Sequence, residues 1–167
     1  LQENEKYLLR VDRTITDNHN AAAIYGYFDG YQFRDSDGDD NEFEFANHNY
    51  TKGAEIESMT VNLTSQWTDN FSTELFYNNS TMDDTQVTVG DKDYGYLHIT
   101  VEESDGTRNT VYMGADDYRQ ANSLDTETDF IKLSGNYLAG NHFITAGYER
   151  ETLVIFNIFV QHSNGGE

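Results

Sequence analysis

Cysteine and proline are absent from this chain, and no apolar run approaches the length of a membrane-spanning helix. Without cysteine, the chain has no disulfide framework, no thiolate chemistry and no cysteine-ligated metal. Without a long apolar run, no transmembrane helix is predicted. A transmembrane β-barrel stays open, because barrel strands alternate between apolar and polar residues and score as polar on average.

Positive charge is also scarce. The chain has 10 Lys and Arg residues against 30 Asp and Glu residues, a formal net charge of -20. A surface of this charge repels phosphate backbones, so we expect no binding to nucleic acid. Its 167 residues are enough for one domain with a core.

Aromatic residues are plentiful, at 14% of the chain with Tyr 12 times and Phe 10 times. Acidic chains that lack aromatics are often disordered, whereas this composition favours ordered β-structure. The dominant pattern is a period-two alternation, in which Met59, Val61 and Leu63 alternate with Thr60 and Asn62. Such alternation predicts strands with one apolar face.

Three hairpins of this kind are predicted, at about residues 7–28, 56–78 and 129–150. Each has a tight turn that contains Asn or Gly, at residues 16–20, 68–70 and 139–141. A seventh strand is expected to start in the apolar run of residues 153–160. Long acidic loops are expected at about 29–53 and 79–126, the second with a small hairpin made by residues 94–101 and 110–113. We therefore predict an all-β, antiparallel up-and-down meander of about six to seven strands.

The apolar face of such strands packs either on a second sheet or on lipid. Short turns at one end and long loops at the other are typical of an outer-membrane barrel. Aromatic residues near the strand ends resemble the girdles of a membrane interface, although aromatics also favour strands in general. The interface candidates are Tyr25, Tyr27, Trp67, Phe71, Tyr77, Tyr137 and Tyr148.

Six or seven strands cannot close around a large lumen and would leave two open edges, which lipid does not tolerate. As a membrane element, residues 1–167 are therefore expected to be an arc of a larger transmembrane β-barrel and a piece of a longer protein. Its partners would be outer-membrane lipid and further barrel strands. On this interpretation Arg10, Asp12 and Lys132, on the polar faces of their strands, face the lumen, whereas in a soluble domain they are surface charges.

Several stretches resemble one family. "KYLLRVDRTITDNHNAAAIYGYFDG", "QWTDNFSTELFY", "NTVYMGADDYRQAN" and "GYERETLVIFNIFVQHSNGGE" are similar, in this order, to segments of Oar-like TonB-dependent outer-membrane receptors. The resemblance implies a 22-stranded barrel, a plug domain, energy input through the TonB system and a large or scarce ligand. No plug domain is recognised in these residues, and the resemblance carries over no ligand-binding residue.

An acidic stretch, "RDSDGDDNEFEF", begins with the rhythm of a calcium loop. Asp35, Asp37 and Asp39 match the first three ligand positions of an EF-type loop, but the positions of the turn glycine and the final glutamate are not matched. A weaker calcium site that also uses Asp40 and Glu42 stays open beside a hydrated loop. Apart from possible calcium, no cofactor is expected.

Catalytic motifs are not found, and no carboxylate pair can be singled out in so acidic a chain. The sequence therefore predicts a non-enzymatic part of a TonB-dependent receptor in the bacterial outer membrane. Two other hypotheses stay open. One is a soluble, secreted β-sandwich that binds calcium or carbohydrate, and the other is a glycan-acting β-enzyme.

Overall fold

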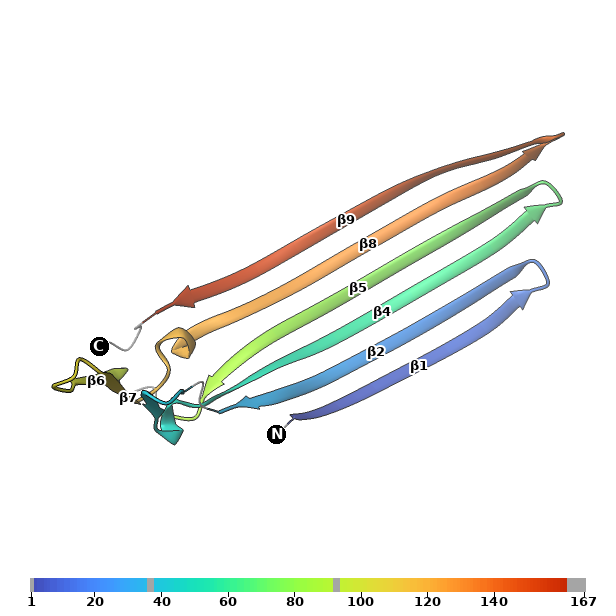
Figure 1. Ribbon diagram of the computed structural model, residues 1–167. Helices are drawn as coiled ribbons and strands as arrows, with labels where there is room; N and C mark the ends of the chain where they lie inside the picture. Colours follow the sequence, from blue (N-terminus) through green and yellow to red (C-terminus); the bar gives the residue numbers. More distant parts are fainter. Residues whose placement is uncertain (1, 36–37, 92–93, 162–167) are drawn as a thin grey trace.

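Six long strands form one antiparallel sheet in the computed structural model, which describes residues 2–35, 38–91 and 94–161. The strands lie in the order β1-β2-β4-β5-β8-β9, so sequence neighbours in this sheet are also spatial neighbours (Figure 1). Their bounds are β1 (Gln2–Thr16), β2 (His19–Arg34), β4 (Tyr50–Thr68), β5 (Phe71–Thr88), β8 (Ala121–Ala139) and β9 (His142–Val160). The predicted all-β meander is confirmed, and its sheet is open, with β1 and β9 as edges.

All three predicted turns are confirmed at one end of the sheet (Figure 1). They connect β1 to β2, β4 to β5 and β8 to β9. Neighbouring hairpins are joined there by backbone hydrogen bonds, since the Gln66 amide donates to the Asn18 carbonyl and the Leu138 amide donates to the Asn70 carbonyl, each at 2.8 Å. The third turn contains Gly140 with a φ of 62°.

The three hairpins are longer than predicted, and the two loops between them are shorter than predicted. The strands reach from Gln2 to Arg34, from Tyr50 to Thr88 and from Ala121 to Val160. Much of the ranges 29–53 and 79–126 is therefore strand. The error has a physical cause, because ladder hydrogen bonds join backbones and persist where both faces carry polar side chains, as at Asn79 and Ser80.

The expected seventh strand is not a separate element. Residues 153–160 continue β9 without interruption and pair with β8 as far as Ala121 and Val160. The apolar run therefore belongs to the same 19-residue strand as the charged residues Glu149, Arg150 and Glu151 that precede it.

A small second sheet lies at the loop end of the large one (Figure 1). It has the order β3-β7-β6, with β3 (Glu42–Glu44), β6 (Leu97–Glu102) and β7 (Arg108–Met113). The predicted hairpin in the second loop is thus confirmed as β6 and β7. There are also two short 3-10 helices, η1 (Ala46–His48), which contacts β7, and η2 (Asp117–Arg119), which contacts β5 and β8 of the large sheet. Among the described residues, no helix is long and apolar enough to cross a membrane.

Replacing Gly140 by alanine tests the turn geometry. Because a positive φ strains residues that carry a Cβ, Gly140→Ala is expected to lower the free energy of unfolding by about 1 kcal/mol. Gly135→Ala is the control, since Gly135 is a strand residue whose added Cβ would make ordinary contacts, with the Phe71 ring at 3.5 Å and the Ala146 carbonyl at 3.9 Å. Urea unfolding of both variants measures the difference, and equal stabilities would contradict the turn assignment.

Candidate functional site

The large sheet has two chemically different faces. The strand registers place the odd-numbered residues of β1, β2, β4, β5 and β8 on one face, together with the even-numbered residues of β9. We call this the belt face, and the opposite one the polar face. The two faces are the candidate functional surfaces of the chain.

An apolar belt crosses the belt face in the half of the sheet nearer the turns. Its side chains have no covering layer within the described residues, as the exposed fractions of Leu9 (63%), Val11 (57%) and Leu133 (51%) show. Among all the residues that the structure describes, Ala115 is the only hydrophobic residue that is buried, and it lies outside the large sheet. The belt contains Tyr7, Leu9, Val11, Ala21, Ala23, Tyr25, Tyr27, Met59, Val61, Leu63, Phe71, Leu75, Tyr77, Ile131, Leu133, Tyr137, Ile144, Ala146 and Tyr148.

Tyrosines mark the border of the belt that faces the loops. The Tyr25 hydroxyl donates to Glu57 at 3.1 Å, and the Tyr77 hydroxyl donates to Asp129 at 2.8 Å. Their rings thus lie in the belt while their hydroxyls reach the acidic residues beyond it. This is the arrangement that amphipathic aromatics adopt between an apolar and a wet region. Tyr27 and Tyr148, two further interface candidates, lie on the same face near this border.

A second group of aromatics marks the border that faces the turns. Trp67 donates its indole N–H to the Thr73 hydroxyl at 2.8 Å, and its ring lies 4.9 Å from that of His19. Phe71 and Tyr137 lie opposite each other in the ladder. All seven predicted interface aromatics therefore lie on the belt face, in two groups separated by aliphatic residues.

The border of the belt is oblique to the strands. The first polar residue beyond the belt on successive strands is Glu5, Asp29, Glu57, Asn79, Asp129 and Arg150. Glu5 is level with Asp29 and Asn79 with Asp129, but the other three steps each shift by two residues, six residues in all over five strand spacings. A shift of about 20 Å along strands over about 24 Å across them gives a slope of about 40°.

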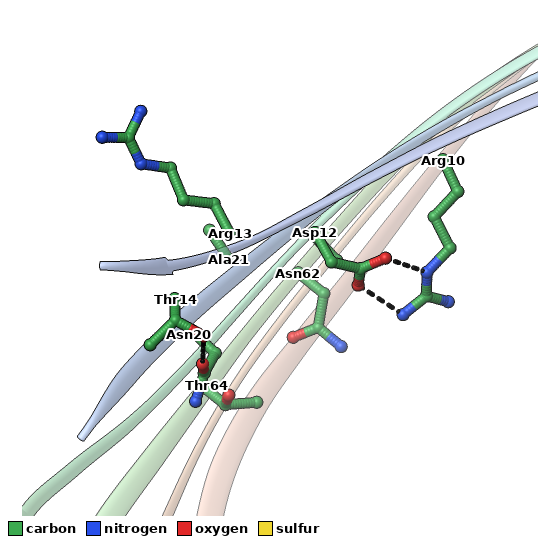
Figure 2. A pocket seen from close by; sticks show the side chains of 9 residues that line it. Arg10, Asp12, Arg13, Thr14, Asn20, Ala21, Asn62 and Thr64 are labelled. Atoms are coloured by element: carbon green, nitrogen blue, oxygen red, sulfur yellow. Dashed lines mark hydrogen bonds and ion pairs between the residues drawn. The ribbon is translucent and has the colours of Figure 1, made fainter. Parts of the chain in front are cut away.

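The polar face contains the predicted lumen residues. Arg10 donates two hydrogen bonds to Asp12, at 2.8 and 2.7 Å, beside an open hollow of about 360 Å³. Figure 2 shows both side chains on the same side of the sheet as Asn62, whereas Arg13 points to the opposite side. The Asn62 amide oxygen is buried without a hydrogen-bond partner.

Lys132 lies on the same face at the far side of the sheet. Its Nζ is 3.9 Å from Glu149 Oε1, next to an open hollow of about 600 Å³. The ladder places Asp12, Ala22, Asn62, Phe76, Lys132 and Glu149 in one row. Asp12 and Lys132 thus share a face and a level, and Arg10 lies two residues along β1 on the same face, but two ion pairs at opposite edges do not form one compact site.

The acidic stretch gives no support for calcium binding. No group of three metal-ligating side chains forms among the described residues, which include Asp35, Asp39, Asp40 and Glu42, and Asp37 lies outside them. Asp39 instead accepts a hydrogen bond from the Asn41 amide at 2.8 Å, and Glu42 accepts one from the Tyr112 hydroxyl at 3.1 Å. Calcium binding by this stretch remains a prediction.

A polar cluster at the loop end was missed by sequence reasoning. Arg119 donates to Asp116 at 3.2 Å, to Gln86 at 3.1 Å and to the Tyr50 hydroxyl at 3.1 Å, and its guanidinium lies 4.2 Å from the Tyr50 ring centre. Buried His48 adds a contact of 3.7 Å to Asp116. Tyr50 and Gln86 lie on the polar face, so the cluster fastens η2 to that face. The sequence signal that could have indicated η2 is Asp116, whose side chain caps this helix by accepting a hydrogen bond from the Tyr118 amide.

Aromatic rings pack behind this cluster. Burial, followed by the nearby Tyr112, Asp117 and Asp116, raises the pKa of Tyr96 to about 12. Burial also raises the pKa of Tyr112, and its hydrogen bond to Glu42 adds to the effect. The His48 ring stacks on that of Tyr112, with ring centres 5.7 Å apart, and is tilted against that of Tyr96, with ring centres 5.5 Å apart.

Comparisons with family models, with curated proteins and with solved structures find no match to this chain. The faces of the sheet and the loop-end cluster therefore carry the functional argument.

Removing the Arg119 guanidinium tests the cluster. Arg119→Met removes the arginine partner of the largely buried Asp116 carboxylate and leaves it the longer contact with His48, so local opening of residues 115–120 is expected to become easier by about 3 kcal/mol. Arg108→Met removes an exposed ion pair with Glu102 and is expected to change the free energy of opening of residues 115–120 by less than about 0.5 kcal/mol. Native-state hydrogen exchange measures both, and equal effects would show that the cluster does not hold η2.

The raised pKa of Tyr96 gives a pH dependence. A folded-state pKa above the unfolded value of about 10 means that the contribution to stability is complete below pH 10 and is lost as the pH rises towards 12. Tyr96→Phe is therefore expected to move alkaline unfolding of the loop end to higher pH. Tyr94→Phe, at a side chain that is 72% exposed, is the control and should leave the midpoint unchanged in near-ultraviolet circular dichroism.

Proposed function

We propose that this chain forms a six-stranded arc of a β-barrel in the bacterial outer membrane. The belt face contacts lipid, and the polar face contacts the interior of the barrel. The observation that carries this proposal is the oblique belt. Its slope of about 40° matches the tilt of about 35–45° that barrel strands adopt in outer membranes.

The size of the belt supports the same conclusion. From Met59 to Trp67 the belt face of β4 extends about 26 Å along the strand, or about 20 Å when projected at this tilt. That height is comparable to the apolar band of about 25 Å around outer-membrane barrels. Aromatics at both borders agree with the girdles of such a band.

The alternative of a β-sandwich needs a second sheet over the belt face. The second sheet found among the described residues is β3-β7-β6, which lies at the loop end and not over the belt. Exposed Leu9 and Val11 would then stand in water in a soluble domain. Lipid supplies the missing apolar surroundings.

The open edges require further strands. In a bilayer the unpaired backbone groups of β1 and β9 are costly, so both edges pair with additional barrel strands. The resemblance to Oar-like TonB-dependent receptors supports a large barrel with a plug domain, driven by the TonB system. The proposed role is non-enzymatic uptake or handling of a large or scarce ligand.

Alternating cysteine labels test this orientation, because the chain has no native cysteine. Single cysteines at Val61 and Leu63 on the belt face, and at Asn62 and Thr64 on the polar face, are introduced into the protein with its full set of barrel strands and labelled with a polarity-sensitive dye in phosphatidylcholine vesicles. We expect a quencher carried on the lipid tails to dim the labels at Val61 and Leu63 several-fold more than those at Asn62 and Thr64.

The outcome separates the two candidate classes. In a soluble sandwich the odd positions are also dry, but a lipid-borne quencher does not reach them and the protein stays outside the vesicles. Equal quenching at odd and even positions would contradict the proposed arc.

A further inference from the structure

The small sheet turns an aliphatic face towards solvent. Ile99, Val111 and Phe43 lie in one row across its three strands, because Phe43 pairs with Val111 and Val111 pairs with Ile99. Phe45 packs edge-on against Phe43 at 5.3 Å. We name the exposed part of this face the aliphatic patch after Leu97, Ile99 and Val101. It also includes the aromatic side chains of Phe43 and Phe45, and all five have exposed fractions of 44–59%.

The opposite face of the same sheet is packed and polar. Tyr112 stacks there with Tyr96 at 6.2 Å and with buried His48 at 5.7 Å. This polarity is the reverse of an ordinary surface sheet, which buries its aliphatic face and wets its polar one. The stacking of Tyr112 with Tyr96 and His48 also holds β7 in place, and β7 supports the aliphatic patch on its other face.

One edge of the small sheet is open beside the aliphatic patch. Within the described residues, β6 pairs on one side only, with β7. An edge strand with free backbone groups is a template for an added strand. A polypeptide that pairs with β6 would extend the aliphatic patch with every second side chain.

Charge decides which polypeptide fits. The other side chains of such a strand would lie beside the face of β6 that carries Glu102, which also pairs with Arg108 at 2.9 Å, and the acidic residues Glu103 and Asp105 follow directly. Glu42 and Glu44 lie on that same face of the small sheet. With a net charge of -20, the chain repels anionic lipid surfaces and attracts cationic segments.

We propose that the aliphatic patch and the open edge of β6 bind an extended polypeptide in which apolar and cationic residues alternate. The apolar side chains cover the patch, and the cationic ones lie beside Glu102. This inference names a ligand class for the proposed receptor. It rests on the proposed function in one respect, which is that the loop end lies outside the membrane.

Synthetic peptides test the proposal on the full chain in phosphatidylcholine nanodiscs, with fluorescence anisotropy of a labelled peptide. A peptide of alternating lysine and valine is expected to bind at least about tenfold more tightly than one of alternating lysine and serine. Its glutamate–valine counterpart should not bind. A lysine–valine peptide with a central proline should bind weakly, because proline removes a backbone donor.

Variants of the patch locate the site. Ile99→Thr combined with Val101→Thr keeps β-branched residues in the strand and is expected to weaken lysine–valine binding about tenfold. Val87→Thr removes an equally exposed apolar side chain from β5, outside the patch, and should have no effect. Circular dichroism of each variant confirms that the strands are retained.

Two results would overturn the inference. Equal binding of the lysine–valine and lysine–serine peptides would show charge attraction alone. Patch-dependent binding to anionic vesicles, without peptide binding, would assign the patch to lipid. The test is independent of the barrel proposal, since the cysteine labels on β4 report membrane orientation whether or not a peptide binds.

Discussion

The uncovered apolar belt is the constraint on which the structure depends. Folded soluble domains hide such side chains in a core, and burial contributes about 1.5–3 kcal/mol for each large one. Here the large sheet is held by its hydrogen-bonded ladder, while the belt side chains stay outside. The surroundings of the sheet therefore complete the fold. Water penalises the exposed belt, and hydrocarbon removes that penalty but also penalises every unpaired edge.

The oblique border links the sequence of each hairpin to the shape of the whole sheet. On each strand the change from apolar to polar occurs at a position set by the local sequence, such as Tyr27 to Asp29 or Met59 to Glu57. The pairing registers between the strands align these separate positions into one border that runs obliquely to the strands. In the proposed barrel, a flat membrane cuts all strands at one height, so strands that follow this line are tilted, and a tilted, twisted sheet is one that curves towards closure.

Much of this architecture was predictable from local patterns. Alternation at Met59, Val61 and Leu63 located a strand and its faces, and Asp69-Asn70 and Gly140-Asn141 located turns. Strand length was not predictable in the same way, because the ladder runs on through Asn79 and Ser80, where alternation ends. The Arg119 cluster was also beyond local patterns, since its partners Tyr50 and Gln86 lie far away in sequence and meet it only through the sheet.

The cluster decides on which side of the sheet the loop end is fastened. Tyr50 and Gln86 belong to the polar face, so η2 is attached to the side away from the belt. Asp116 carries this attachment to His48, which stacks on Tyr112 of β7 and packs against Tyr96, the residue before β6. A chain of packed and hydrogen-bonded groups thus connects the small sheet with the polar face. Strain applied at the small sheet would reach the polar face before the belt face, because these contacts lie on the polar side of the sheet.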